Sequence, residues 1–492
     1  MNRMSYNPSI YEINTRVFLK RFGPNARIDK IPDDYLDYLS QLKIDYVWFM
    51  GIWKTCPSSV EKYCFEEGLV RNYSRALKNW QKEDVIGSPF AVDLYEINET
   101  LGSPEDLINL KSQLNRRGIG LILDFIPNHF NVESNLLKTN PDIFLNVDKE
   151  LFDRDPHTYF RTGAEGENYF AHGRDPFFPA WQDTVQVNFF SRPARDFLSD
   201  TVLNLTGICD GVRCDMAMLA LNNVFKNTWT GVLARTNQSE IKEEFWSETI
   251  RKVKNARPDF LFIAEAYWDL EWELQQLGFD YTYDKSLTDR LRSDYVSVIK
   301  EHLLAEDEYQ RKSIRFIENH DEERAVPSFG KEKSKAAAII ISTVQGMRFY
   351  NDGQFEGKKI KLPVQLGREP EETINPEFSD FYNRLLAITS HRVFKEGKWL
   401  LLEPGTSWEG NHSFLNILAW SWNLNEEGRL VVVNYSNMIS TCRLKFDLIG
   451  FPEEFELRDL LNDQNYLRSA EEIHSAGLFI ELKPWQAHIF KY

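Results

Sequence analysis

A short strand-like run near the middle of the chain, the five residues Gly-Val-Arg-Cys-Asp that end at Asp215, carries an arginine and an acid two positions apart. Side chains alternate across a β-strand, so Arg213 and Asp215 share one face while the valine and the cysteine point to the other. Such a pair is either a structural ion pair or an acid that its guanidinium neighbour keeps ionised, as a nucleophile must be. The choice between the two depends on the rest of the chain.

Three more segments place acids, amides or imidazoles where a buried strand ends. They are the run from Asp124 to Asn128 and His129, the run that ends at Glu265, and the run from Glu318 through His320 to Asp321. Each has a structural alternative, because aspartate and asparagine cap turns, a buried histidine can be fully hydrogen-bonded, and a glutamate can pair with a nearby arginine. That alternative would have to hold at all of these segments at once.

Several carboxylates, without a metal-spaced cluster of histidine or cysteine and without a glycine-rich phosphate loop, are typical of glycoside hydrolysis. One carboxylate must be ionised to attack the anomeric carbon, and Asp215 beside Arg213 fits that role. A second must be protonated to donate to the leaving oxygen. Glu265 fits because it lies in the apolar segment 260–268, which would raise its pKa.

A third acid, Asp321, could hold sugar hydroxyls together with His320 and His129 while the ring flattens toward an oxocarbenium ion. Hydrogen bonds of this kind accelerate a reaction where they strengthen in the transition state. In a barrel of parallel strands the active site lies at the carboxyl ends of the strands, which is where all of these residues fall in the predicted pattern.

The segments that must position these residues alternate between strand and helix patterns. The expected strands lie at 11–19, 46–53, 120–126, 211–215, 260–265, 279–283, 313–318 and 338–344. Eight strands that alternate with helices predict an α/β fold, a (β/α)8 TIM barrel over residues 1–397. The weak periodicity of residues 130–185 predicts an irregular subdomain inserted after strand three. Short strand-like runs parted by Gly, Asn and Pro predict a C-terminal antiparallel β-sandwich over residues 398–492.

The composition narrows the class of partner. With 58 Lys and Arg against 74 Asp and Glu, the 492 residues carry a formal net charge of −16, which argues against nucleic acid and anionic membranes and suits a neutral oligosaccharide or α-glucan. The five cysteines show no disulfide or metal spacing, and no apolar run reaches membrane length. We expect a cytoplasmic enzyme, and the sequence leaves its oligomeric state undetermined.

The motifs resemble, in order and spacing, those of the α-amylase superfamily, glycoside hydrolase family 13. They are D-F-I-P-N-H from Asp124, G-V-R-C-D to Asp215, F-I-A-E to Glu265 and F-I-E-N-H-D to Asp321. The resemblance covers nearly the whole chain, including the insertion and the C-terminal sandwich. It implies Asp215 as nucleophile, Glu265 as general acid and base, and Asp321 as the stabiliser of the transition state.

The resemblance also implies supporting roles. Arg213 would orient the nucleophile, and His129 and His320 would bind sugar at the cleavage subsite. Asp124 would belong to the substrate-binding residues and would organise the loop that follows it. Phe90 would stack on the sugar, and because tyrosine is usual at this position, the stacking is kept while a hydroxyl is lost.

Two departures from the family pattern bear on specificity and on metal. Met218 and Leu219 stand where typical amylases carry Lys and His toward the leaving group. Gln186 replaces an aspartate that is a calcium ligand in many members, although Asn128, another candidate calcium ligand, is retained. We therefore expect that no cofactor is required and that calcium is not essential.

The resemblance implies a retaining α-glycosidase that acts on α-glucosidic bonds of malto-oligosaccharides or α-glucans through a covalent glycosyl intermediate on Asp215. The same residues would serve a transglycosylase or a sucrose or glucoside phosphorylase. The third hypothesis is a non-catalytic carbohydrate-binding or partner subunit. The presence of all three acids argues against it. The long excursion 54–87 either walls off one side of the cleft, which would favour short substrates, or only packs its own loop.

Overall fold

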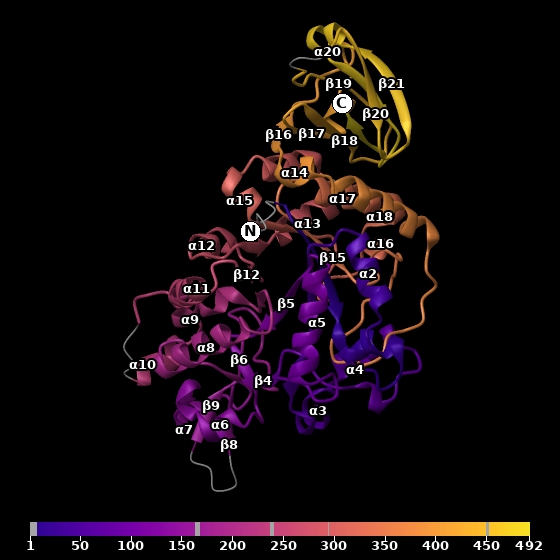
Figure 1. The fold of residues 1–492 in the computed structure, drawn as a ribbon. Coiled ribbons are helices and arrows are strands. Elements are labelled where there is room, and N and C mark those ends of the chain that lie inside the picture. Colours follow the sequence, from indigo (N-terminus) through magenta and orange to yellow (C-terminus); the bar gives the residue numbers. More distant parts are fainter. Residues whose placement is uncertain (1–6, 163–167, 237–240, 294, 449–451) are drawn as a thin grey trace.

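The computed structural model describes residues 7–162, 168–236, 241–293, 295–448 and 452–492 (Figure 1). Parallel strands close into a barrel in the order β1-β15-β14-β13-β12-β11-β5-β2. Their bounds are β1 Ser9–Asn14, β2 Tyr46–Met50, β5 Gly120–Phe125, β11 Gly211–Cys214, β12 Leu261–Ala264, β13 Tyr281–Tyr283, β14 Ser313–Arg315 and β15 Met347–Asn351. The predicted (β/α)8 barrel is confirmed.

Apolar side chains fill the inside of the barrel. Because neighbours along a strand face opposite sides, each strand supplies one set of residues to the interior and another to the surrounding helices. The interior set forms a cluster of its own, which includes Trp48, Ile122, Tyr283 and Phe349. The barrel is therefore a packed core, and the polar groups of a site can gather only at its ends.

Helices cover the outside of the barrel between successive strands. The longer ones are α2 Asp33–Gln41, α5 Pro104–Arg116, α8 Arg192–Leu205, α11 Phe245–Ala256, α13 Lys285–Ser293, α14 Val296–Leu303, α17 Lys331–Thr343 and α18 Pro376–Thr389. The N-terminus of α5 forms a capping box. The Ser103 hydroxyl accepts from the Asp106 amide, and the Asp106 carboxylate accepts from the Ser103 amide.

One strand prediction was wrong. The apolar run 338–344 belongs to α17, and the eighth strand is β15, which begins at Met347. The run reads as a buried strand because it is apolar on every side, and α17 is indeed buried nearly all round. It lies between the barrel and the C-terminal sheets, where Thr343 O accepts from Trp422 Nε1 at 2.6 Å. Periodicity alone cannot separate a buried helix from a buried strand.

The chain between β5 and α8 forms the irregular insertion that was expected. It contains β6 His129–Asn131 paired antiparallel with β10 Thr184–Gln186, and a small sheet of β7 Asn146–Val147, β9 Asn168–Ala171 and β8 Tyr159–Thr162. Residues 163–167 of the predicted subdomain lie outside the described residues. The pairing of β6 with β10 ties the end of the insertion to the chain that directly follows β5.

The excursion after β2 is folded. It contains β3 Trp53–Thr55, α3 Pro57–Tyr63, α4 Glu67–Ala76 and η3 Lys82–Asp84, and β3 pairs with β4 Val92–Ile97. Its aromatic and aliphatic side chains form a cluster that also includes Leu366, from the segment after β15. The Ile86 amide donates to Gln365 O at 2.8 Å, and Arg368 pairs with Asp84 at 2.7 Å. The excursion and the segment after β15 therefore form one rim of the barrel.

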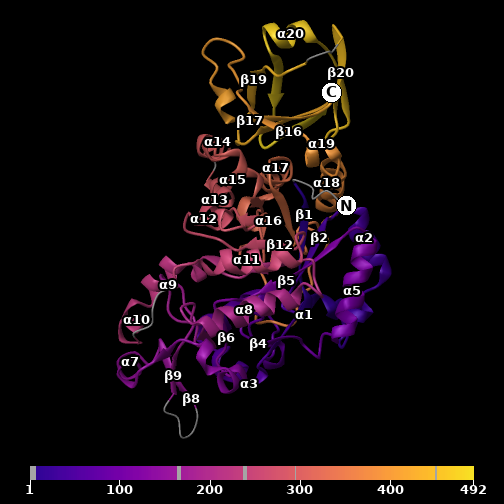
Figure 2. The same cartoon turned by 60° about the vertical axis from the view of Figure 1, so that its left-hand side comes forward.

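The C-terminal part forms two antiparallel sheets, in the orders β16-β17-β18-β23-β20-β21 and β19-β22. Their strands are β16 Lys398–Leu402, β17 Ile417–Leu424, β18 Glu427–Asn434, β19 Ser440–Leu444, β20 Glu454–Asp459, β21 Gln464–Ser469, β22 Leu478–Leu482 and β23 Ala487–Lys491. Apolar residues of both sheets, such as Leu430 and Leu478, form a core cluster. Figures 1 and 2 show this sandwich at one end of the molecule and the insertion at the other.

Candidate active site

The predicted motifs converge at the carboxyl ends of the barrel strands around one guanidinium. Arg213, on β11, is 1% exposed. Its Nη1 lies 2.7 Å from Asp215 Oδ1 and 3.7 Å from Asp124 Oδ1, and its Nη2 lies 2.7 Å from Glu265 Oε2. These acids come from three neighbouring strands of the barrel. A single cation therefore faces the two carboxylates that the sequence analysis assigned to bond cleavage.

Aromatic rings surround the rest of the Arg213 guanidinium. Its central carbon lies 5.0 Å from the ring centre of Trp48, 5.4 Å from that of Phe90 and 5.7 Å from that of Tyr283. Contacts between a cation and aromatic faces are favourable, and more so away from water. The rings hold the guanidinium in one orientation, so that it can fix both carboxylates.

Asp215 directly follows β11, and its amide donates to Phe125 O at 2.8 Å, so the sheet fixes where its side chain starts. The next residue, Met216, has a left-handed backbone with φ of 42°, which is uncommon for a long side chain. Asp215 is 6% exposed. Burial raises the pKa of Asp215, and the charge and hydrogen bond of Arg213 oppose that rise. Arg213 is thus the main group that favours the ionised form.

Glu265 follows β12 and is 3% exposed. Its Oε2 accepts from the Met216 amide at 2.7 Å, and its Oε1 accepts from the Tyr267 hydroxyl at 2.9 Å. Burial raises the pKa of Glu265 to about 7, against the opposing charge of Arg213, while the nearby Asp215 carboxylate adds to the rise. A carboxyl group with this pKa can donate and take back a proton near neutral pH.

Asp321 lies beyond β14, with its carboxylate turned toward His320. His320 Nε2 is 2.9 Å from Asp321 Oδ2, and the Asp321 side chain is 50% exposed. Desolvation alone would raise the pKa of Asp321, but the charge of His320 outweighs it and lowers the pKa to about 2. Asp321 is therefore an ionised acid that a ligand can reach.

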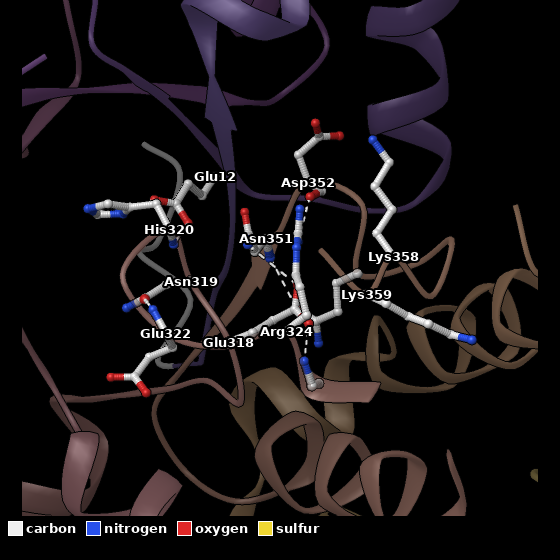
Figure 3. Close-up of polar contacts among 12 residues, drawn as sticks. Glu12, Glu318, Asn319, His320, Glu322, Arg324, Asn351, Asp352, Lys358 and Lys359 are labelled. Carbon is white, nitrogen blue, oxygen red and sulfur yellow. Dashed lines mark hydrogen bonds and ion pairs between the residues drawn. The ribbon is translucent and has the colours of Figure 1, made fainter. Parts of the chain in front are cut away.

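The buried partner of His320 is Glu12, which the sequence analysis did not single out. Glu12 lies on β1 and is 1% exposed. Its Oε1 accepts from His320 Nδ1 at 2.5 Å and its Oε2 accepts from the His320 amide at 3.2 Å, and Figure 3 shows the two side chains next to each other. Burial alone would lower the pKa of His320, but Asp321 and Glu12 raise it well above its usual value. The available signal was a lone acid inside the apolar first strand.

Phe90 and Lys361 complete this side of the site. The Phe90 ring is stacked on the His320 ring, with centres 5.3 Å apart and planes 29° apart. The Lys361 ammonium donates to the Asp321 carbonyl oxygen. Phe90 comes from the end of the excursion after β2, and Lys361 from the segment after β15. The two segments of the rim thus both reach the pair of His320 and Asp321.

His129, on β6, is 5% exposed, and its ring centre lies 5.2 Å from that of Trp181 in the insertion. Burial lowers the pKa of His129 to about 4. At neutral pH this side chain is uncharged, in contrast to His320. It can therefore exchange hydrogen bonds with a sugar hydroxyl without adding charge to the site.

Asp124 lies on β5 and is 1% exposed. Its Oδ2 accepts from the Gly51 amide at 3.0 Å, and burial raises its pKa to about 7. This hydrogen bond links β5 to the chain after β2. Met218 and Leu219 are buried in η5 Ala217–Ala220, so neither offers a polar group to a substrate.

The residues at the candidate calcium position do not fit a metal ion. Gln186 is fully buried, and its Nε2 donates to Asn128 Oδ1 at 2.9 Å and to the carbonyl oxygens of Asn128 and Val187, each at 3.0 Å. Calcium requires oxygen ligands around the cation. Here the oxygens converge on an amide nitrogen, which takes the place that a cation would need.

Two other observations concern the described residues as a whole. Within the described ranges, no group of three or more His, Cys, Asp or Glu side chains is arranged to hold a metal ion. In the same part of the chain, no helix has both the length and the apolar character needed to cross a membrane.

Several known proteins resemble this chain in sequence or in fold. The family model described as "Alpha amylase, catalytic domain" matches residues 33–157. "Alpha-amylase MalA" of Haloarcula japonica is 24% identical over 465 residues, which cover 92% of this chain and 58% of that protein. "Alpha-amylase 2" of Dictyoglomus thermophilum is 22% identical over 476 residues, 92% of this chain and 68% of that protein. The crystal structure of a noncanonic maltogenic alpha-amylase, AmyB from Thermotoga neapolitana, superposes with a TM-score of 0.69 at 18% identity and covers 99% of both chains.

Over residues 33–157 the chain matches the α-amylase catalytic-domain model, and over 92% of its length it is similar to proteins named α-amylases. The chain spans 58% of the length of the Haloarcula protein, so the likeness does not extend to all of that protein. The match to the Thermotoga structure, in contrast, covers both chains almost completely and includes the C-terminal sandwich. The likeness in fold therefore covers the barrel and what surrounds it.

Proposed function

We propose that the protein is a retaining α-glycosidase that acts on α-glucosidic bonds of malto-oligosaccharides or α-glucans. The observation that supports this most is the fork of Arg213, which contacts the carboxylates of Asp215 and Glu265, each at 2.7 Å. A shared guanidinium keeps the two acids next to each other, as a covalent route requires. The relatives named above are called α-amylases, which agrees with this substrate class.

In the first step, an Asp215 carboxylate oxygen attacks the anomeric carbon of the bound sugar. The glycosidic carbon–oxygen bond breaks, and the carboxyl proton of Glu265 passes to the leaving oxygen. This step needs Asp215 ionised and Glu265 protonated. Arg213 favours the first condition, and the burial that raises the pKa of Glu265 to about 7 favours the second.

In the second step, Glu265 is an ionised base. It takes a proton from water, and the water oxygen attacks the anomeric carbon, so that the bond to Asp215 breaks and Glu265 is protonated again. In the transition state of each step the sugar ring carries partial positive charge. The ionised carboxylate of Asp321, with its pKa held at about 2, supplies opposite charge at the exposed side of the site.

A second candidate is transfer of the glycosyl group to another sugar or to phosphate. It is favoured by Met218 and Leu219, which are buried and leave the leaving-group side without the polar side chains that typical amylases carry there. Hydrolysis and transfer use the same residues and differ only in the group that attacks the intermediate.

We also propose that no calcium ion is required, because the Gln186 amide already occupies the position between the oxygens of Asn128 and Val187. The same amide restrains the chain around Asn128, next to His129. Catalysis in this proposal depends on protein side chains alone.

The test is a time course of maltoheptaose with the purified protein, with and without phosphate, followed by proton NMR of the anomeric region. Short products released as α-anomers support the retaining hydrolase. Products both longer and shorter than the donor indicate transfer between sugars, and a sugar phosphate that forms only with phosphate indicates phosphorolysis.

The matched variants are Asp215→Asn and Asp289→Asn, the second of which changes an exposed acid on α13. Asp215→Asn should lower kcat by about three orders of magnitude or more with unchanged circular dichroism, because the nucleophile is lost. Asp289→Asn should leave kcat unchanged. Equal inertness of the wild-type protein and Asp215→Asn toward every glucoside tried would refute the enzymatic proposal.

A further inference from the structure

A cavity of about 760 Å³ lies outside the group of catalytic acids. Its walls come from α1 Thr15–Phe18 and the turn of η1 Leu19–Phe22 that continues it, the start of α3, the end of η3, and the chain at 98–101. This volume is typical of pockets that hold a small organic molecule. No residue assigned above to glycosidic bond cleavage lines it.

Much of the cavity wall is apolar. The apolar lining includes Leu19, Val60, Phe65, Val85, Ile86 and Leu101. A ligand that buries an apolar body here would be stabilised by the removal of that surface from water. The shape and lining therefore favour a molecule with a hydrocarbon or aromatic part over a free inorganic ion.

Arg16, which lines the same cavity, is a buried cation without an acidic partner. It is 5% exposed, and in the described part of the chain no carboxylate forms an ion pair with it. Its Nη2 donates to the carbonyl oxygens of Gly87 at 2.9 Å and Val364 at 2.6 Å, while its Nε is buried without a hydrogen-bond partner. Burial lowers the pKa of Arg16 to about 10.

An unpaired buried charge is costly, and proteins normally pair such a group with an opposite charge. The other buried guanidinium at this end of the barrel, that of Arg213, contacts carboxylates directly. Arg16 differs in that, among the described residues, its hydrogen bonds go to carbonyl oxygens, and it lines a cavity large enough for a ligand. An anionic group in the cavity would supply the missing charge.

The remaining charges on the cavity wall also favour an anionic ligand. Lys82 pairs with Glu61 at 2.6 Å, and Arg27 pairs with Asp106 at 3.0 Å, so these cations are already balanced. Lys20 lines the cavity and forms no ion pair among the described residues, and the exposed Glu99 is the acid left at the wall. The single negative charge of Glu99 cannot balance the two positive charges of Arg16 and Lys20. The cavity wall therefore carries a net positive charge that can attract an anionic ligand.

We propose that this cavity is a second ligand site, which takes a small organic anion. The apolar body of the ligand packs against the side chains around Phe65 and Ile86, and its carboxylate, phosphate or sulfonate group faces Arg16 and Lys20. The site stands apart from the proposed glycosidase reaction, and it is tested by binding, so that each proposal can fail without the other.

Arg16 also gives the site a physical connection to the catalytic acids. The carbonyl oxygens that it holds belong to Gly87, three residues before Phe90, and to Val364, three residues after Lys361. Phe90 stacks on His320, and Lys361 donates to the Asp321 carbonyl. A ligand that binds Arg16 can therefore change how the segments around Gly87 and Val364 are held. By thermodynamic linkage, bound substrate would in turn change the affinity of the protein for that ligand.

The experiment is a titration of the folded wild-type protein with anilinonaphthalene sulfonate, an aromatic anion, followed by fluorescence and calorimetry. We expect binding of one molecule per chain. The neutral analogue anilinonaphthalene should bind at least about tenfold more weakly, because it lacks the charged group that Arg16 would hold. Equal binding of the anion and the neutral analogue would refute the assignment of an anion site.

Variants locate the bound probe. Val60→Trp fills the cavity and should abolish binding of one equivalent, while Lys20→Gln should weaken it about two- to fivefold, as expected for an exposed charge. Arg16→Gln should weaken it at least about tenfold where the variant folds. Lys78→Gln, an exposed lysine outside the cavity, is the control and should bind as the wild type does. Unchanged binding in Val60→Trp would show that the probe lies elsewhere and would overturn the proposal.

Discussion

At the scale of single residues, the site is a set of charges whose protonation is fixed by their neighbours. Arg213 favours the ionised form of Asp215, and burial favours the protonated form of Glu265. His320 is held as a cation between Asp321 and a buried glutamate, Glu12. Acids of one type thus differ in pKa because their surroundings differ.

The Glu265 pKa gives the first prediction. Because Glu265 must be protonated to donate to the leaving oxygen, kcat/KM should fall as the pH rises through about 7. The Tyr267 hydroxyl donates to the Glu265 carboxylate and so favours its ionised form. Tyr267→Phe should therefore move this fall to higher pH. A pH profile of kcat/KM for maltoheptaose checks both statements, and a flat profile across neutral pH contradicts the assignment of Glu265 as the acid.

Glu12 gives the second prediction. Glu12→Gln removes the negative charge from His320 Nδ1, so the His320 pKa should drop and its imidazolium should be lost at a lower pH than in the wild type. We expect kcat/KM to fall about tenfold, since a charged hydrogen bond in the site is weakened. Nitrogen-15 NMR of the His320 ring follows the pKa directly. A purely structural role for Glu12 would lower stability and leave the His320 pKa unchanged.

At the scale of elements, the turns after the strands bring the side chains together. The chain leaves β11 through Met216, at a φ of 42°, and this turn places the Met216 amide on Glu265. After β12, Trp268 and Asp269 have φ of 65° and 61°. Non-glycine residues in this conformation are costly and tend to occur at functional sites. The turns that follow both catalytic strands are therefore strained.

The pairing of β6 with β10 gives the third prediction. The buried amide of Gln186 donates to oxygens of Asn128 and Val187, so a chelator should leave the melting temperature of the wild type unchanged. Gln186→Glu is the matched variant, with the same length and a carboxylate oxygen in place of the amide nitrogen. It should lower the free energy of unfolding by about 2 kcal/mol or more, because a carboxylate oxygen that cannot donate a hydrogen bond then faces the acceptor oxygens of Asn128 and Val187.

Calcium should restore part of the stability of Gln186→Glu and have no effect on the wild type, since only the variant offers a set of oxygen ligands. Thermal unfolding with and without calcium measures both proteins. A chelator that lowers the melting temperature of the wild type would show that the Gln186 amide does not replace a metal.

At the scale of the whole molecule, the barrel and the C-terminal sandwich share apolar packing. The largest core cluster contains Trp420 and Trp422 of β17 together with barrel residues such as Ile340 of α17. Hydrogen bonds cross the same contact, from Trp422 Nε1 to Thr343 O and from the Tyr435 hydroxyl to Leu291 O, each at 2.6 Å. The two parts should therefore support each other's stability.

This contact gives the fourth prediction. Urea unfolding should show one transition, at the same midpoint for fluorescence and for circular dichroism. Trp422→Ala should lower the free energy of unfolding by about 3–5 kcal/mol, because it leaves a cavity and an unpaired carbonyl between the two parts. Trp408→Ala removes a 56% exposed tryptophan of the same sandwich and should change stability by about 0.5 kcal/mol or less. Two separate transitions in the wild type would contradict the shared core.

The sequence by itself predicted the barrel and the acids that lie together at its rim. Alternation along short strands is a local pattern, which short stretches of sequence display without reference to distant residues. Asp215 and Glu265 could be proposed as site residues because each directly follows a strand, and Asp321 because it lies six residues beyond β14, and these strands end at one rim of the barrel. The run 338–344 could not be assigned correctly, because its neighbours on every side are apolar and only the packing shows that it is a helix.

Only the tertiary structure decided which distant side chains share a charge. Glu12 and His320 are 308 positions apart, and nothing in their local sequence links them. Gln186 takes its role from Asn128, 58 positions away, because β6 and β10 pair across the insertion. Arg16 is an unremarkable arginine in the sequence, and it becomes a buried cation because two rim segments close over it. Local pattern fixes each element, whereas partners, burial and therefore pKa values arise when the elements meet.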